Sequence, residues 1–351
     1  MIPDFYSSWH ISLQLLLFVV AFIVGIVFLV KFCDIFVDSA SAIARRFKIP
    51  PMIIGLTIVA MGTSCPELAV SVSDSISCLI NGGNANVAIG NVVGSNIFNI
   101  LVVLGVSALF TPIIIKRATL KKEYPILILT SFLLLIFGIL FGIGTVTGNY
   151  AILRWEGIIL VVLMIAYISY LVIDAIKHPI EVKEEKKNIK IWLAIILVVI
   201  GACGIALGGE FVVFGAKNLA LSGADAIGVD HDLAESLVGL TIVAAGTSLP
   251  ELVTSAIAAK KGENEIALGN VIGSNIFNIL FVLGISATVN PLISGSAVIV
   301  DLIVMMTVTL ILFGFSFKGK IDRKIGIIFI LIYLLYLTYL ILRTLNIIPG
   351  F

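Results

Sequence analysis

Long apolar stretches separated by short polar loops recur along the whole chain of 351 residues. Most of these stretches have about 20 residues or more, the length that an α-helix needs to cross the roughly 30 Å hydrocarbon core of a bilayer. Ten such segments are predicted, at residues 11–36, 51–79, 84–110, 124–143, 155–176, 191–222, 234–259, 265–290, 296–316 and 324–346. The pattern predicts an all-α polytopic membrane protein with ten transmembrane helices.

The composition agrees with this reading. Hydrophobic residues make up 60% of the chain and charged residues 12%, and the mean hydropathy is +1.19. A soluble domain of this size needs far more charge to cover its surface. The N-terminus has no basic region and no cleavage site, so we expect the first segment to be a retained helix rather than a signal peptide.

The basic residues are distributed unevenly between the predicted loops. If the N-terminus lies outside, loops that face the cytoplasm contain 18 of the 22 Lys and Arg residues. The opposite side keeps Arg154, Lys217 and Arg343, and Lys31 lies within the first segment. This positive-inside bias predicts a multi-pass protein of the cell membrane with both termini extracellular.

Two sequence motifs occur twice. GLTIVAMGTSCPEL (55–68) returns as GLTIVAAGTSLPEL (239–252), with 12 of 14 residues identical. GNVVGSNIFNILVVLG (90–105) returns as GNVIGSNIFNILFVLG (269–284), with 14 of 16 identical. The first pair is offset by 184 residues and the second by 179, which predicts that one short loop differs in length.

The duplication divides the chain into two five-helix repeats, residues 1–176 and 191–351, joined by a short charged cytoplasmic linker at 177–190. Because five is odd, the second repeat is inverted relative to the first. Inverted repeats with discontinuous helices at the midplane are typical of secondary transporters that work by alternating access. A duplicated channel or structural protein is the alternative.

Each copy of the first motif places a glutamate directly after a proline. Pro66 and Pro250 interrupt a helix and release backbone carbonyls that cannot face lipid. Glu67 and Glu251 each place a carboxylate in the membrane, which costs several kcal/mol without a partner. The sequence places no buried Lys or Arg to pair permanently with these glutamates. We therefore expect a cation that binds reversibly to compensate their charge.

Helical spacing gathers further oxygen groups around these acids. The first motif lines one helical stripe in both copies: Ala60, Thr63, Ser64 and Glu67, and Ala244, Thr247, Ser248 and Glu251. The second motif adds a stripe spaced by four residues: Asn91, Ser95 and Asn99, and Asn270, Ser274 and Asn278. Interhelical hydrogen bonding is the alternative role for the Asn/Ser stripe. An all-oxygen set suits hard cations such as Ca²⁺ or Na⁺, not Zn²⁺ or Cu⁺.

These motifs resemble the two alpha-repeats of the cation/calcium exchanger superfamily, in particular its sodium/calcium exchanger branch. The matching residues are GTSCPE with GNVVGSNIFN, and GTSLPE with GNVIGSNIFN. Proton/calcium exchangers of the superfamily typically carry a GNATE-like motif instead, which favours the sodium-coupled branch. The resemblance covers both repeats and the ten-helix topology.

The resemblance implies roles for individual residues. It implies that Glu67 and Glu251 bind Ca²⁺, with the backbone carbonyls of Thr63 and Thr247. It implies Na⁺ or central polar sites at Ala60, Ser64, Glu67, Ser95, Asn99, Ala244, Ser248, Glu251, Ser274 and Asn278. Some relatives, including potassium-dependent ones, have aspartate in place of Asn278, so we expect exchange that does not need K⁺.

The resemblance also implies that the first and sixth segments slide to switch access, and we hypothesise that Asp34 and Glu210 on these segments line an access path. A role at a helix end or at the membrane interface is the alternative for both acids.

The expected function is a secondary antiporter in which the Na⁺ gradient drives Ca²⁺ extrusion. H⁺/Ca²⁺ exchange and a passive cation channel are the alternatives. No enzymatic activity and no cofactor are expected. The expected partners are the transported ions Ca²⁺ and Na⁺ and the lipid bilayer, without nucleic acid; the oligomeric state is left open.

Overall fold

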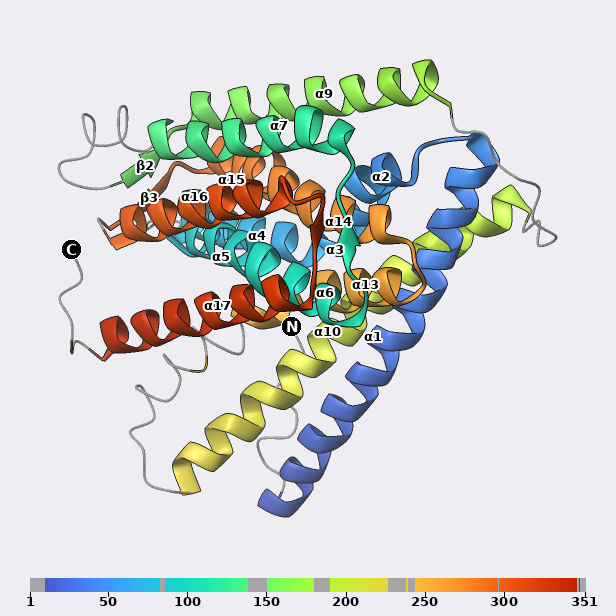
Figure 1. Cartoon of the computed structure of the whole chain (residues 1–351). Coiled ribbons are helices and arrows are strands. Elements are labelled where there is room, and N and C mark those ends of the chain that lie inside the picture. Colours follow the sequence, from blue (N-terminus) through green and yellow to red (C-terminus); the bar gives the residue numbers. More distant parts are fainter. Residues whose placement is uncertain are drawn as a thin grey trace.

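The computed structural model describes residues 10–82, 86–137, 150–179, 190–226, 238, 244–295, 297–345 and 347, and these are almost entirely helical (Figure 1). The helices of the first half are α1 (Ile11–Phe47), α2 (Pro51–Ile54), α3 (Ala60–Thr63), α4 (Cys65–Asn81), α5 (Asn86–Phe98), α6 (Leu104–Phe110), α7 (Arg117–Ile136) and α9 (Arg154–Lys177). Those of the second half are α10 (Ile191–Ala226), α12 (Ala244–Thr247), α13 (Leu249–Lys260), α14 (Asn264–Phe277), α15 (Leu283–Val289), α16 (Ala297–Ser316) and α17 (Arg323–Thr344). The π-helical turns η1 (Gly55–Val59), η2 (Asn99–Val103) and η5 (Asn278–Val282) join consecutive helices into longer ones.

Each of the ten predicted segments contains a helix, and the all-α fold of two inverted five-helix repeats is confirmed. In the described chain seven helices are long and apolar enough to cross a bilayer, and the bent helix of α2 to α4 makes an eighth. The other two segments form α7, whose first turns carry several charges, and α12–α13, which follows residues outside the described part. The helices differ in how deeply they are buried. In the most apolar stretch of α14–α15, 94% of the residues are buried, whereas in the corresponding stretches of α1 and α17 only 17% are. The α14–α15 helix is therefore central and the other two are peripheral.

The second and seventh predicted segments are each broken in the middle. α3 ends at Thr63 and α4 begins at Cys65, and the two parts of this helix meet at 49°. The breaks fall at Ser64 (φ −85°, ψ 10°) and Ser248 (φ −92°, ψ 5°), which have nearly the same backbone conformation. Pro66 and Pro250 then lie in the first turn of the following helix, where the missing N–H is tolerated. The predicted discontinuous helices are therefore present.

Equivalent loops of the two halves pair with the opposite half. β1 (Ile113–Ile114), which precedes α7, pairs with β4 (Lys320–Ile321), which precedes α17. β3 (Leu292–Ser294), which precedes α16, pairs with β2 (Tyr150–Ile152), which precedes α9. Both pairs are antiparallel, and each joins one loop from either half. This reciprocal pairing is what an inverted duplication produces.

Glycine contacts repeat the same reciprocity. A Cβ atom on Gly326 of α17 would lie 2.6 Å from the carbonyl oxygen of Gly105 of α6. A Cβ atom on Gly157 of α9 would lie 2.7 Å from the carbonyl oxygen of Gly284 of α15. Such distances leave no room for a side chain, so glycine lets the outer helix of each half pack closely against the central helix of the opposite half.

α1 and α10 lie side by side over much of their length and cross the remaining helices steeply (Figure 1). Their contact is close because α10 presents glycines to α1: a Cβ atom on Gly208 would lie 2.8 Å from the Leu29 nitrogen, and one on Gly215 would lie 2.6 Å from the Phe18 oxygen. In their most apolar stretches 17% of the α1 residues and 28% of the α10 residues are buried. In these stretches the pair forms one unit with most of its residues on the outside of the protein.

Two details of the sequence prediction are wrong. The first helix ends at Phe47 rather than at residue 36, because Val37, Ala40 and Ala44 continue a buried apolar face beyond the predicted end. The five-residue difference between the motif offsets lies in a helix rather than in a loop, since α4 has 17 residues and α13 has 12.

Candidate cation site

Glu67 and Glu251 are completely buried, and each lies in the first turn of the helix that follows a break. The first turn of a helix presents free N–H groups and the positive end of the helix dipole, so both carboxyl groups lie where negative charge is favoured. The two broken helices bring these ends together in the interior, where hydrogen bonds connect them.

Serines at the breaks bond across the two halves. Ser64 Oγ donates to Glu251 Oε1 at 2.7 Å, and Ser248 Oγ donates to Glu67 Oε1 at 3.1 Å. The sequence had placed Ser64 and Glu67 on a single helical stripe. Because the helix breaks at Ser64, its hydroxyl instead reaches the acid of the opposite half. Neither half therefore forms the site alone.

The second oxygen of each carboxyl group has no donor. Glu67 Oε2 and Glu251 Oε2 are buried without a hydrogen-bond partner among the described residues. The ion pairs found in that part of the chain all lie elsewhere. A buried carboxylate oxygen without a donor is costly, and a cation held between the two acids removes that cost.

Thr63 and Thr247 are the last residues before the two breaks. Thr63 Oγ1 donates to Asn270 Oδ1 at 3.1 Å, and Thr247 Oγ1 donates to Asn91 Oδ1 at 3.4 Å. Each hydroxyl thus joins a break to an asparagine of the opposite half.

The two serines of the second motif have different surroundings. Ser95 Oγ donates to Glu67 Oε1 at 3.2 Å and lies 2.9 Å from Ser248 Oγ. Ser274 is also completely buried and lies beside the Glu251 carboxyl group, but its hydroxyl makes no hydrogen bond within the described residues. Both serines lie beside the acids, as the sequence predicted. Of the two hydroxyl groups, that of Ser95 donates a hydrogen bond to a carboxyl group.

Asn99 and Asn278 begin the π-helical turns η2 and η5 and are completely buried. Asn278 Nδ2 donates to Ser95 Oγ at 3.2 Å, which connects this amide to the Glu67 side of the site. The Asn278 Oδ1 atom and both amide atoms of Asn99 have no partner in the described part of the chain.

The two predicted alanines begin the short helices α3 and α12. Ala60 is completely buried, and its carbonyl oxygen accepts a hydrogen bond from Ser64 N at 3.0 Å. For Ala244 the backbone is described but the side chain is not. Ala60 lies close to the break, as predicted, with its carbonyl oxygen already hydrogen-bonded.

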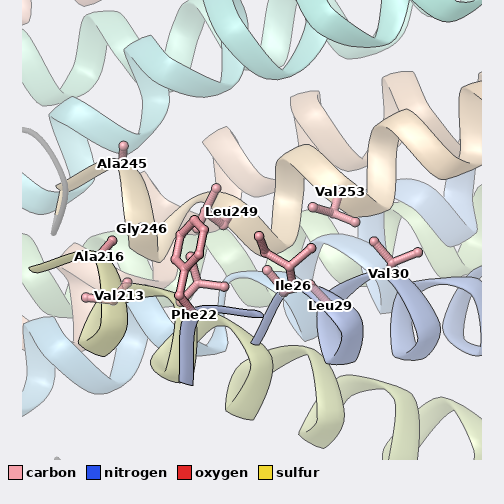
Figure 2. Close-up of a pocket in the computed structure, with 11 residues that line it drawn as sticks. Phe22, Ile26, Leu29, Val30, Val213, Ala216, Ala245, Gly246, Leu249 and Val253 are labelled. Atoms are coloured by element: carbon pink, nitrogen blue, oxygen red, sulfur yellow. The ribbon is translucent and has the colours of Figure 1, made fainter. Parts of the chain in front are cut away.

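An apolar cavity of about 350 Å³ separates the α1–α10 pair from the second break (Figure 2). Phe22 and Ile26 line it from α1, Val213 lines it from α10, and Gly246 and Leu249 line it from either side of Ser248. The helix that carries Glu251 therefore meets the outer pair partly across unfilled space, so this contact resists displacement less than a close-packed one does.

On the cytoplasmic side of the predicted topology, Asp34 and Asp38 of α1 bind Lys261, which follows α13. Lys261 Nζ lies 2.6 Å from an Oδ1 atom of each aspartate. Partial burial lowers the pKa of Lys261, but its hydrogen bonds to the two aspartates outweigh that effect and raise the pKa. Glu210 is exposed on α10. The access-path role of Asp34 and Glu210 stays a prediction.

The sequence prediction missed two buried asparagines, one in each copy of the second motif. Asn96 and Asn275 are buried neighbours of Ser95 and Ser274, and they bond across the halves: Asn96 Nδ2 donates to the Asn275 carbonyl at 3.2 Å, and Asn275 Nδ2 donates to the Asn96 carbonyl at 3.3 Å. Their presence in both copies of the motif was the available signal. Among the described residues, no group of three or more His, Cys, Asp or Glu side chains is placed to hold a metal ion, so two carboxylates with neutral oxygens make up this site.

Comparisons of the sequence and of the structure with known proteins both find sodium/calcium exchangers. The profile of the family described as sodium/calcium exchanger protein matches residues 17–173 and 190–342. The sodium/calcium exchanger MaX1 of Methanosarcina acetivorans is 32% identical over 344 residues, covering 89% of this chain and 95% of that protein. The inner membrane protein YrbG of Escherichia coli is 33% identical over 283 residues, covering 77% and 79%. A solved structure of the sodium-calcium exchanger NCX_Mj, soaked with 10 mM Na⁺ and 10 mM Sr²⁺, superposes with a TM-score of 0.76 at 31% identity, covering 92% of this chain and 98% of that one.

Proposed function

The chain belongs to the sodium/calcium exchanger family, whose members exchange Ca²⁺ for another cation, and we propose that here Na⁺ moving inward drives Ca²⁺ out of the cell. The relatives named sodium/calcium exchangers support Na⁺ as the coupling ion. The transported ions are substrates, and no cofactor is needed for this activity.

The observation that carries the proposal is the reciprocal bonding of Glu67 and Glu251. Each acid is held on one oxygen by a serine of the opposite half, and its other oxygen is buried without a donor in the described chain. Two carboxylates balance the charge of one Ca²⁺ or of two Na⁺, so ions of different valence can compete for one electrostatic well. We assign Ca²⁺ to Glu67 and Glu251 with the carbonyls of Thr63 and Thr247.

For Na⁺ and the central polar positions we assign the remaining oxygen groups of the site. These are Ala60, Ser64, Ser95, Asn99, Ala244, Ser248, Ser274 and Asn278, shared with the two acids. Asn278 is a neutral amide, so the site holds two carboxylates rather than three. Two charges leave little electrostatic support for a bound K⁺ in addition to Ca²⁺, and we propose exchange independent of K⁺.

Alternating access is assigned to movement of the α1–α10 pair. The pair contacts both breaks through small residues, since Gly62 lies against Phe36 and Gly246 lies against Val213. The apolar cavity beside Gly246 leaves part of the contact between the pair and the second break unfilled. We further assign the repeats to 1–176 and 191–351, with the 177–190 linker in the cytoplasm and both termini outside.

The test is uptake of radiolabelled Ca²⁺ into proteoliposomes loaded with Na⁺, in Na⁺-free medium, with K⁺ and pH varied separately. Uptake that requires internal Na⁺ and ignores K⁺ is the expected result. Uptake driven by a pH gradient without Na⁺ would make the coupling ion H⁺. Ca²⁺ entry without any counter-gradient would replace exchange by passive conduction.

A further inference from the structure

A chain of hydrogen bonds connects Asn96 to the cation site. Asn96 Oδ1 accepts a hydrogen bond of 3.2 Å from Asn278 Nδ2, and the same Asn278 Nδ2 donates to Ser95 Oγ, also at 3.2 Å. Ser95 in turn donates to Glu67 Oε1. Asn96 and Asn278 are 1% and 0% exposed, so water does not compete for these bonds.

The direction of each bond in this chain follows from the first one. Asn96 Nδ2 faces the Asn275 backbone carbonyl, and a carbonyl oxygen can only accept a hydrogen bond. The Asn96 atom that faces Asn278 must therefore be Oδ1, which accepts a hydrogen bond. Asn278 must donate that bond through Nδ2, the donor of its amide. The Asn278 Oδ1 atom is left buried and without a partner among the described residues.

We propose that Asn96 is a positioning residue that fixes the Asn278 amide so that its oxygen, rather than its NH₂ group, is available to the transported cation. An amide that is free to flip would present NH₂ to the ion in part of the population, and the N–H dipoles would repel it. The proposal rests on the cation site assigned above and adds a residue that touches no ion itself.

The opposite half provides a matched comparison. Asn275 makes the same amide-to-carbonyl bond as Asn96, but its Oδ1 atom has no partner in the described chain, and neither does the amide of the equivalent Asn99. Asn96→Leu and Asn275→Leu each remove one bond of the reciprocal pair. Of the two, Asn96→Leu is the change that also removes one of the two hydrogen bonds that orient the Asn278 amide, leaving the bond to Ser95.

The experiment measures Ca²⁺ binding by calorimetry on purified full-length protein in detergent, together with the melting temperature. We expect Asn96→Leu to weaken Ca²⁺ binding about 10-fold and Asn275→Leu less than about 2-fold, with similar losses of melting temperature. Equal effects of the two variants on Ca²⁺ binding, or no effect of Asn96→Leu, would overturn the proposal. If a leucine variant does not fold, the alanine pair makes the same comparison.

A second variant tests the orientation itself. Asn278→Asp presents an oxygen whichever way the side chain turns, so Asn96→Leu should weaken Ca²⁺ binding less than about 2-fold in the Asn278→Asp background. A 10-fold loss that persists there would assign Asn96 a purely structural role. Because binding is measured without a coupling ion, failure of Na⁺-driven exchange in proteoliposomes would be recorded separately from either outcome.

Discussion

Glu67 and Glu251 occupy equivalent positions in the two halves, but the hydrogen bonds that hold them differ. Glu67 Oε1 receives Ser248 at 3.1 Å and Ser95 at 3.2 Å, whereas within the described residues Glu251 Oε1 receives Ser64 at 2.7 Å. The sequence around the acids is nearly identical in both halves. Small differences in how the helices pack therefore give two acids with the same neighbours different hydrogen bonds.

A second difference lies at the outer helices. Lys122 of α7 pairs with Asp174 of α9 at 2.6 Å, and at the equivalent positions Asp301 of α16 pairs with Arg343 of α17 at 3.1 Å. The two pairs have the same place in the inverted repeat but opposite charges, at opposite faces of the membrane in the predicted topology. Duplication conserved the interaction while the residue types exchanged sides.

The largest expected effect is on the acids themselves. Glu67→Gln and Glu251→Gln each remove one of two buried charges that balance the ion, so each should lower Na⁺-driven Ca²⁺ uptake at least about 100-fold while the protein still folds. The measurement is uptake into proteoliposomes, with Glu263→Gln in the α13–α14 loop as a matched control. If both acid variants retain Na⁺-driven Ca²⁺ uptake, the site assignment is wrong, and the different hydrogen bonds of the two acids have no bearing on transport.

The serines sharpen the comparison. Ser64→Ala leaves Glu251 Oε1 without its donor, whereas Ser248→Ala leaves Glu67 Oε1 with Ser95. Since a hydrogen bond to a charged group is worth about 1.5–3 kcal/mol, Ser64→Ala should weaken the apparent Ca²⁺ affinity roughly 10-fold and Ser248→Ala roughly 3-fold. The check is the Ca²⁺ dependence of uptake at fixed internal Na⁺. Equal losses would mean that the two acids are held equivalently in solution.

The ion pairs of the outer helices should affect stability rather than transport. Asp301 is 9% exposed and also accepts a hydrogen bond of 3.1 Å from Tyr336, so Asp301→Asn should cost about 2 kcal/mol of unfolding free energy. Asp174→Asn should cost about 1 kcal/mol or less, because the Lys122 side chain is 39% exposed, against 19% for Arg343. Thermal unfolding in detergent, followed by tryptophan fluorescence, measures both.

The exchange of charges between halves can be tested directly. Lys122→Asp places a third acid beside Asp174 and Glu123 and should lower the melting temperature. Adding Asp174→Arg recreates the arrangement of the second half and should recover most of that loss. Failure to recover it would show that the two pairs are not interchangeable and that the equivalence of these positions is superficial.

The smallest effect on transport is expected from the ion pair between Lys261 of the second half and α1. Lys261→Gln removes an exposed ion pair with Asp34 and Asp38, and it should change the exchange rate by no more than about 3-fold. Hydrogen exchange at the cytoplasmic end of α1 should become faster, with Lys260→Gln as the control. The raised pKa of Lys261 means that this contact is present at neutral pH and is lost only as the pH rises through that pKa. If hydrogen exchange at α1 is unchanged in Lys261→Gln, contacts other than this ion pair hold the cytoplasmic end of α1 in place.

Much of this protein's architecture follows from its sequence. Apolar length gave the ten segments, the odd number of segments per repeat gave the inversion, and Pro66 and Pro250 gave the broken helices, because each of these depends on local chemistry or on counting. Glu67 and Glu251 were identified for the same reason: a buried acid is costly wherever the fold places it.

The sequence could not determine which groups of opposite halves meet. It placed Ser64 beside Glu67, whereas the break turns Ser64 to Glu251, and it gave no partner for Asn96. A duplicated motif offers every polar group two equivalent partners, one in its own half and one in the other. The choice between them depends on how the broken helices cross in space, and that is a property of the tertiary packing rather than of spacing along the chain.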